Sequence, residues 1–291
     1  MPLLFGKSML SYRHSYHAGN HADVLKHATQ VLLLNKFKQK NKPFCYLDTH
    51  SGAGLYSLES EQAQKTAEYQ GGIAKLWPLK QEFPELSDYF EVISHHNPNG
   101  QLLHYPGSPE IARYLLRQQD NMQLIELHNN EINELRNNLG FDNRVHIHHR
   151  NGFEGLVGLL PPTPARGFVL IDPSYELKTD YQAVIDGVQK ALKRWPKAVI
   201  AVWYPILAEK RDYSEWLAYK LSQLSINNLL RAELSVEAQQ LEFGMHGSGM
   251  MIINAPWQLD TQLESLVPKL LDVLDADGQG SSRVDWVVEG E

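Results

Sequence analysis

Short apolar runs and helical patterns alternate along the chain from residue 43 onwards. The apolar runs have the length of buried strands, and strands that alternate with helices are typical of a parallel sheet covered on both faces. The pattern therefore predicts an α/β protein. The predicted strands span residues 44–48, 122–127, 144–148, 167–172, 198–204 and 250–254. The predicted helices span residues 109–118 (with Ser108 as N-cap), 130–139, 180–195 and 209–224.

The spacing after the first predicted strand departs from a simple nucleotide-binding unit. In such a unit, the acid that binds the ribose falls about 20 residues after the glycine loop. Here the next strand that ends in an acid delivers Glu126, which is 72 residues beyond Gly54 (126 minus 54). Residues 55–104 are therefore predicted to form a small, mostly helical subdomain inserted into a main domain of residues 1–54 and 105–291. An insertion at this point lies above the strand ends, so a substrate contact or a structural elaboration would explain it.

Positive charge is concentrated in the first 42 residues, although the whole chain has a net charge of −7. This segment carries seven Lys or Arg against one acid, Asp23, a balance of +6 that leaves −13 for the rest. A basic face on an acidic body can hold a phosphate backbone, and Arg13 and Lys26 belong to this segment. Alternatively, the lysines within residues 36–42 form a solvated helix end beside the negative pole of the helix dipole.

Other features of the composition narrow the class of protein. The single cysteine, Cys45, lies in an apolar run, so we predict a buried thiol and no disulfide. The apolar runs are far shorter than the roughly 20 residues of a membrane span, and no signal-peptide pattern is visible. His17 and His21 have the spacing of a metal pair, but no third ligand accompanies them. We expect a cytoplasmic protein without a metal centre, and a monomer, since nothing indicates an obligate protein partner.

Three strand ends carry residues suited to a nucleoside. Gly52 and Gly54 follow the first strand, where glycine lets the backbone pass close to a ligand. Glu126 ends the next strand, and its carboxylate can accept hydrogen bonds from both ribose hydroxyls of an adenosine. At a third strand end, the side-chain amide of Asn151, followed by Gly152, can meet an adenine ring edge. A plain turn would also explain the glycine pair, and helix capping would explain Glu126.

The fourth predicted strand ends in Asp172-Pro173-Ser174-Tyr175. Proline confines Asp172 to an extended conformation, so its carboxylate and the Pro173 carbonyl can face one point. An adenine amine is a poor nucleophile because its lone pair is delocalised into the ring, and two acceptors on its N–H groups localise that pair toward a methyl sulfonium. Tyr175 offers a face on which a flipped base can stack. Although Asp-Pro also opens ordinary turns, the pattern predicts methyl transfer from S-adenosylmethionine, with Asp172, Pro173 and Tyr175 at the catalytic site.

Several longer segments resemble one protein family. Residues 11–27, which read S-Y-R-H-S-Y-H-A-G-N-H-A-D-V-L-K-H, closely resemble the opening of the bacterial RlmJ family. Members of that family are adenine-N6 methyltransferases of 23S ribosomal RNA, the RNA of the large subunit. The likeness covers nearly the whole chain from about Met9 onwards. It continues through residues 46–54, 105–109, 124–128, 171–173, 175–184, 203–205 and 247–250.

The resemblance implies a Rossmann-like, S-adenosylmethionine-dependent methyltransferase with a helical insertion. It implies that Asp172 is catalytic and also lies near the cofactor, and that Tyr12, on an N-terminal tail, contacts the RNA. The cofactor contacts that it implies come from His27, His50, Ser108, Glu126 and the turn at Asn151 and Gly152. The expected partner is therefore 23S ribosomal RNA.

Two positions depart from the family pattern. The family often has Asp-Gly where this chain has Asn151-Gly152, and it usually has proline where Ser174 stands, which restores a backbone N–H to the turn. Residues 1–8 precede the usual start of the family. Three alternatives remain: a DNA adenine methyltransferase with the same chemistry, a protein-glutamine methyltransferase, whose related turn typically begins with Asn, and a non-catalytic RNA-binding protein that retains the fold.

Overall fold

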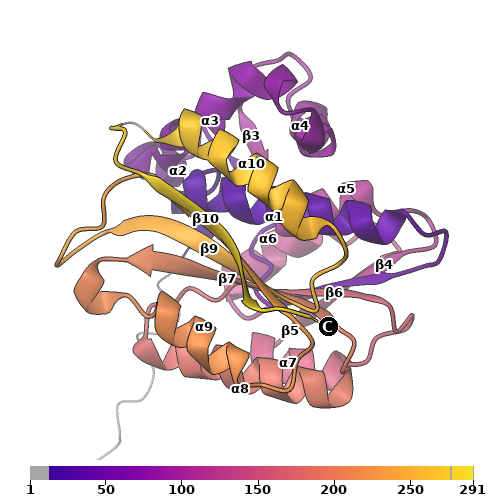
Figure 1. The fold of residues 1–291 in the computed structure, drawn as a ribbon. Coiled ribbons are helices and arrows are strands. Elements are labelled where there is room, and N and C mark those ends of the chain that lie inside the picture. The colour runs from indigo at the N-terminus through magenta and orange to yellow at the C-terminus, as the bar shows by residue number, and fades with distance from the viewer. Residues whose placement is uncertain (1–12, 276, 291) are drawn as a thin grey trace, which may run out of the picture.

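A computed structural model describes residues 13–275 and 277–290, and its centre is a large mixed sheet (Figure 1). The eight strands lie in the order β10-β8-β9-β7-β6-β1-β4-β5, and β2 and β3 form a separate two-stranded sheet. The strands of the large sheet are β1 (Cys45–Asp48), β4 (Asn121–Glu126), β5 (Val145–His149), β6 (Gly167–Ile171), β7 (Val199–Leu207), β8 (Leu229–Ser235), β9 (Met245–Ile253) and β10 (Ser281–Val288).

The five neighbouring strands β5, β4, β1, β6 and β7 are parallel, as the sequence pattern predicts. The prediction of a parallel sheet is wrong for β9, β8 and β10, each of which is antiparallel to its neighbours. The reason is the short connection of residues 236–244 between β8 and β9, since a parallel crossover needs a dozen or more residues. Strands β8 and β10 were not predicted, because charged residues interrupt their apolar pattern. Two of these, Arg231 and Asp285, form a bidentate ion pair between the strands.

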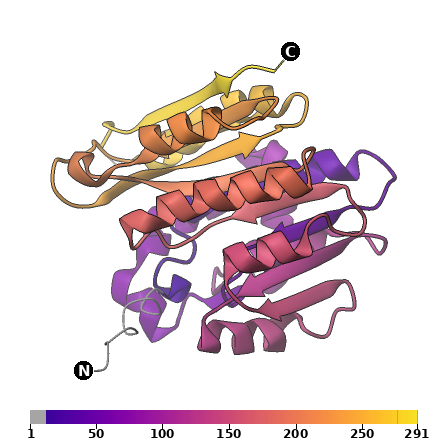
Figure 2. The ribbon, with the colours of Figure 1, turned by 90° about the horizontal axis from the view of Figure 1, so that it is seen from below.

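Helices cover both faces of the sheet (Figures 1 and 2). The helices on one face are α1 (His21–Lys38), α5 (Ser108–Leu115), α6 (Asn129–Leu139) and α10 (Leu259–Leu274). Those on the other face are α7 (Gly152–Leu159), α8 (Lys178–Arg194) and α9 (Ser214–Ser222). None of the helices within the described residues is long and apolar enough to cross a membrane. Cys45 is buried in β1, and burial raises the pKa of its thiol to about 12.

Two helices begin at other residues than the sequence pattern predicts. Gly107, not Ser108, is the N-cap of α5, and Ser108 is the first helical residue, so its hydroxyl is available for another contact. Helix α9 is shorter than predicted: it begins at Ser214, with Tyr213 as N-cap, and the first residues of the predicted helix form a separate 3-10 turn at Glu209–Arg211.

Residues 55–104 form short helices between the two strands of the small sheet. Their buried side chains, including Ile73, Tyr89 and Ile93, belong to the same hydrophobic core as α1. Figure 1 shows α3 and α4 beyond α1 and α10, on the side away from the sheet. Of this segment, Tyr56 lines the cavity described below. The elements are β2 (Leu55–Ser57), α2 (Glu61–Thr66), α3 (Ile73–Leu76), α4 (Ser87–His96) and β3 (His104–Pro106), with 3-10 turns at Glu68–Gly71, Trp77–Glu82 and Pro84–Leu86.

Candidate active site

A cavity of about 270 Å³ opens where β1, β4 and β6 end. Parallel α/β sheets bind ligands at this edge, because the loops that leave neighbouring strands converge there. Most of the predicted site residues lie on its wall: Lys26, His27, His50, Gly52, Ser108, Glu126, Asn151, Asp172 and Pro173. Three others, Gly54, Gly152 and Tyr175, lie behind the wall.

Asp48, at the end of β1, is fully buried and bonded by the protein itself. The hydroxyls of Tyr46 and Ser108 donate to its Oδ2 at 2.6 and 2.7 Å, and the His50 N–H donates to its Oδ1 at 3.2 Å. Burial raises the pKa of Asp48 to about 6. This carboxylate therefore joins the first loop of the cavity to the start of α5. It also accepts the hydrogen bond of the Ser108 hydroxyl, which is therefore bonded within the protein.

Glu126, at the end of β4, holds two loops together. Its Oε2 accepts the Gly52 N–H at 2.7 Å, and its Oε1 accepts the His128 N–H at 2.6 Å. Gly52 has a φ of +61°, and a side chain there would overlap the Tyr56 hydroxyl. The glycine is required at this point because the loop turns sharply and packs directly on Tyr56.

Gly54 and Gly152 support the wall without lining it. Gly54 has a φ of +81°, and a Cβ there would lie 2.8 Å from a methyl group of Leu139, so it lets the loop pack on α6. Gly152 lies under His50, where a Cβ would approach the imidazole ring to 2.9 Å. Both glycines allow close packing, and the structure assigns neither of them a direct place in the cavity.

Asn151 lines the cavity and also starts α7. Its Oδ1 accepts hydrogen bonds from the N–H groups of Phe153 and Glu154 at 3.0 and 3.2 Å, which caps the helix. Its Nδ2 has no hydrogen-bond partner among the residues that the structure describes, so the amide can still donate to a ligand.

The two predicted histidines are neutral at physiological pH. Burial lowers the pKa of His27 to about 3 and that of His50 to about 4. His27 contacts the Tyr105 hydroxyl through Nδ1 at 2.7 Å, whereas its buried Nε2 has no hydrogen-bond partner in the described part of the chain. His50 contacts the Thr49 hydroxyl and packs edge-on against Phe153.

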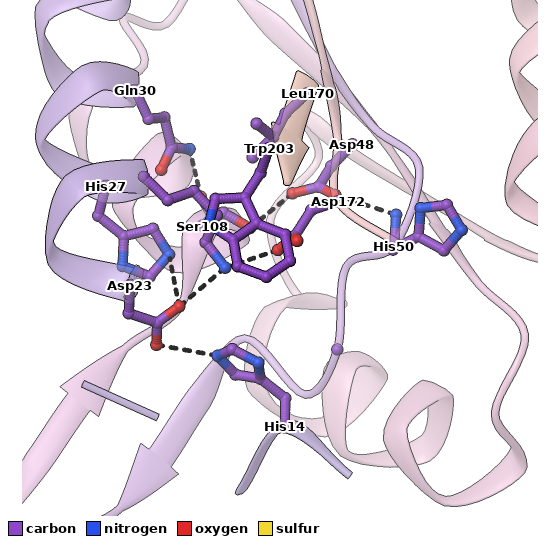
Figure 3. Close-up of polar contacts among 12 residues, drawn as sticks. His14, Asp23, His27, Gln30, Asp48, His50, Ser108, Leu170, Asp172 and Trp203 are labelled. Atoms are coloured by element: carbon purple, nitrogen blue, oxygen red, sulfur yellow. Dashed lines mark hydrogen bonds and ion pairs between the residues drawn. The ribbon is translucent and has the colours of Figure 1, made fainter. Parts of the chain in front are cut away.

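Asp172 follows β6 and pairs with Lys26 of α1. Figure 3 shows Asp172 together with Asp23 and His14. The Lys26 ammonium donates to Asp172 Oδ2 at 2.6 Å and lies 2.8 Å from Asp23 Oδ1, while His14 Nε2 and the Gly19 N–H contact Asp23 Oδ2 at 2.9 and 2.8 Å. Burial lowers the pKa of Lys26, but the two carboxylates outweigh it and raise the pKa above its ordinary value. Lys26, which we predicted to contact the RNA, is thus a buried cation beside the predicted catalytic acid.

Tyr175 is placed differently from the prediction that its ring offers a stacking face. Its side chain is 5% exposed and packs between Tyr181 and Trp203, and its hydroxyl donates to the Trp203 carbonyl at 2.7 Å. The residue has a φ of +50°, a left-handed conformation that is unfavourable for a bulky side chain. This conformation turns the ring into the core below the Asp172 turn, away from the cavity.

The basic N-terminal segment is divided between two places. Tyr12 lies outside the described residues, and Arg13 directly precedes His14, which lines the cavity. The lysines within residues 36–42 lie instead at the last turn of α1 and just before β1 begins, at the opposite edge of the sheet from the cavity. Lys38 there pairs with Asp88 at 3.6 Å. The interpretation of these lysines as a solvated helix end therefore agrees with the structure.

Several acids of the site were not predicted: Glu131, Glu176 and Asp180 line the cavity, and Asp23 pairs with Lys26 on its wall. Asp23 is the sole acid among the first 42 residues, and a lone acid in a basic segment was the signal that it pairs internally. Glu131, in the first turn of α6, lines the cavity, yet nothing in its sequence context separates it from an ordinary acid near a helix N-terminus. Among the described residues, no cluster of three or more His, Cys, Asp or Glu could hold a metal ion.

The fold and the cavity together define a class of protein. A glycine loop after β1, an acid at the end of the neighbouring parallel strand β4 and an acid directly after β6 line one cavity, and the acid that ends β1 is bonded to Ser108 on its wall. This is the arrangement of a Rossmann-like, S-adenosylmethionine-dependent methyltransferase.

Comparison with known proteins narrows the class to a family. The sequence model of the family described as "Ribosomal RNA large subunit methyltransferase D, RlmJ" matches residues 41–288. The protein named ribosomal RNA large subunit methyltransferase J is 46% identical over 280 residues in Escherichia coli K12 and 43% identical over 280 residues in Haemophilus influenzae. Each alignment covers 96% of this chain and 99% of the relative. A crystal structure of protein LPL1258 from Legionella pneumophila is 34% identical, with a TM-score of 0.86, and the alignment covers 94% of this chain and 99% of that one. The chain belongs to the RlmJ family.

The family assignment makes the chain an enzyme that transfers a methyl group from S-adenosylmethionine. The residues of the cavity fit this donor. His27 Nε2 and one oxygen of Glu131 are buried without a hydrogen-bond partner in the described residues, and the Asn151 amide retains its donor. Such groups match the mixed donors and acceptors of an adenosine and an amino acid.

Proposed function

We propose that this chain is a cytoplasmic enzyme that methylates N6 of one adenine in 23S ribosomal RNA. The observation that carries the proposal is the Asp172 carboxylate on the cavity wall, next to Pro173 and bonded through Oδ2 to Lys26. Its Oδ1 has no hydrogen-bond partner within the described residues, so it can accept an N–H group. The names of the relatives support ribosomal RNA as the substrate, and the resemblance to the RlmJ family supports adenine N6.

Asp172 and Pro173 orient the amine of the target base in this proposal. One N–H donates to Asp172 Oδ1 and the other to the Pro173 carbonyl, which localises the nitrogen lone pair. Lys26 fixes the direction of the carboxylate, because the ammonium is itself held by Asp23. Bound S-adenosylmethionine supplies an electrophilic methyl group. The amine loses a proton during or after transfer, so no strongly basic side chain is required, and alignment accounts for much of the rate.

The remaining residues divide between donor and RNA. We assign His27, His50, Ser108, Glu126 and Asn151 to the donor side, where they line one cavity with Gly52. Gly54 and Gly152 shape this side from behind. We assign Tyr12 and Arg13 to the RNA, because they directly precede His14 at the cavity. Tyr175 holds the Asp172 turn through its bond to the Trp203 carbonyl.

The test is methylation of 23S ribosomal RNA and of duplex DNA by the same purified protein, followed by mass mapping of methyladenosine. We expect N6-methyladenosine at one position of the RNA and none in DNA. The variant Asp172→Ala should abolish the product, whereas the control Asp186→Asn, which changes an exposed acid on α8, should leave it unchanged. Methylation of DNA in preference to RNA, or full activity of Asp172→Ala, would contradict the proposal.

A further inference from the structure

Glu131 lines the cavity, and one of its carboxylate oxygens has no hydrogen-bond partner among the residues that the structure describes. The residue lies in the first turn of α6, is half-buried and lines the cavity beside His128. Its Oε2 is buried and has no hydrogen-bond partner, and the side chain forms no ion pair, among the residues that the structure describes. A buried polar atom without a partner is unfavourable, so the carboxylate gains from turning an oxygen toward a donor that a ligand brings into the cavity.

Glu126, the acid predicted to bind the ribose, is already occupied. Each of its two oxygens accepts a short hydrogen bond from a backbone N–H, one from Gly52 and one from His128. Those bonds join the loops that follow β1 and β4. Glu126 can still accept through its remaining lone pairs, but its position is set by the protein, whereas the Oε2 of Glu131 has no such task.

The surroundings of Glu131 favour a neutral donor of hydrogen bonds. Burial raises the pKa of Glu131, and the charge of Glu126 raises it further, while His14, His128 and Arg13 act in the opposite direction. No cation is bonded to it within the described residues. Glu131 opens onto the cavity with Glu126 and Leu127, at the end of β4, which is the strand end where the ribose of a nucleotide lies in such folds.

We propose that Glu131 accepts a hydrogen bond from a ribose hydroxyl of the methyl donor, and that Glu131 and Glu126 together recognise the ribose diol. The proposal rests on S-adenosylmethionine as the donor but not on ribosomal RNA as the substrate. In this proposal Glu131 is a cofactor-binding residue. It contributes to the affinity for both the donor and its demethylated product, since both carry the same ribose.

The first test measures binding without RNA. Calorimetric titration of the purified full chain with S-adenosylhomocysteine compares Glu131→Gln with the control Glu134→Gln, which makes the same change one turn away on the exposed side of α6. We expect Glu131→Gln to weaken binding about tenfold, because a neutral amide oxygen that can also present its NH2 group replaces a charged acceptor, and Glu134→Gln to have no effect. Equal affinity of Glu131→Gln and the wild type would overturn the proposal.

The second test identifies the hydroxyl. The 2′-deoxy and 3′-deoxy forms of S-adenosylhomocysteine should bind the wild type more weakly, and for one of them Glu131→Gln should cause no further loss. If the substitution weakens both deoxy ligands as much as the parent ligand, the ribose assignment is wrong. Methylthioadenosine, which lacks the amino acid, should lose affinity with Glu131→Gln; an unchanged affinity would assign Glu131 to the ammonium group instead and overturn the proposal.

Discussion

The acids at the ends of β1 and β4 differ from the acid that follows β6 in how many hydrogen bonds the protein itself donates to them. Asp48 accepts hydrogen bonds from three groups of the protein and Glu126 from two, so both carboxylates join loops. Asp172 is bonded to Lys26 through one oxygen, and its side chain is 15% exposed. Acids that are adjacent on one sheet edge thus have different tasks, and the number of protein donors around each indicates which carboxylate remains free to act on a ligand.

The largest expected effect follows from removing the cation beside Asp172. Lys26→Met leaves Asp23 and Asp172 without their shared buried partner, and we expect the free energy of unfolding to fall by about 3–5 kcal/mol. Denaturant unfolding of the variant and the wild type measures this. Lys40→Met, at the opposite edge of the sheet, should change stability by less than about 0.5 kcal/mol. Similar stability of Lys26→Met and Lys40→Met would show that the buried pair is not formed.

The next effect concerns the pH dependence that Asp48 causes. Burial raises the pKa of Asp48 to about 6, so the folded state binds a proton that the unfolded state releases, and this group destabilises the fold as pH rises from 4 to 6. Asp48→Asn removes this penalty. The free energy of unfolding of the variant, relative to that of the wild type, should therefore be higher at pH 7 than at pH 4, by up to about 3 kcal/mol. Unfolding curves at both pH values measure the difference. An equal difference at both pH values would contradict the raised pKa.

A smaller effect is expected where Gly52 meets Glu126. Gly52→Ala combines a left-handed backbone with overlap on the Tyr56 hydroxyl, and we expect a loss of about 2 kcal/mol in stability and weaker binding of S-adenosylhomocysteine. Gly100→Ala is the matched control, because Gly100 has a φ of +79° but open space around it. If the two variants lose the same stability and bind the ligand equally well, close packing at Gly52 is unimportant.

The smallest effect is expected at Ser108. Ser108→Ala removes one of three donors from Asp48, and we expect a loss of about 1.5 kcal/mol in the free energy of unfolding. Ser108→Thr keeps the hydroxyl and should recover part of this loss. Thermal or denaturant unfolding of the two variants distinguishes the hydrogen bond from a simple effect of side-chain volume, which would make Thr the worse substitution.

Much of the fold was predictable because local patterns carry it. The apolar runs around Leu47, Ile125 and Ile171 mark the parallel strands, and the acids beside them mark the strand ends that surround the cavity. Strand β8 escaped prediction because Arg231 interrupts its apolar pattern, and its partner Asp285 lies 54 residues away. Tyr175 was misplaced because its left-handed backbone has no signal in a four-residue motif.

The sequence by itself determined the α/β class, the positions of the strand-end acids and the likeness to the RlmJ family, since these depend on local composition and order. The tertiary structure decided which carboxylates are already bonded. The Lys26 and Asp172 pair joins residues 146 positions apart, and the Gly52 and Glu126 bond spans 74 positions. Such bonds arise only when distant strands meet at one edge of the sheet, so the task of each acid depends on neighbours that the local sequence does not contain.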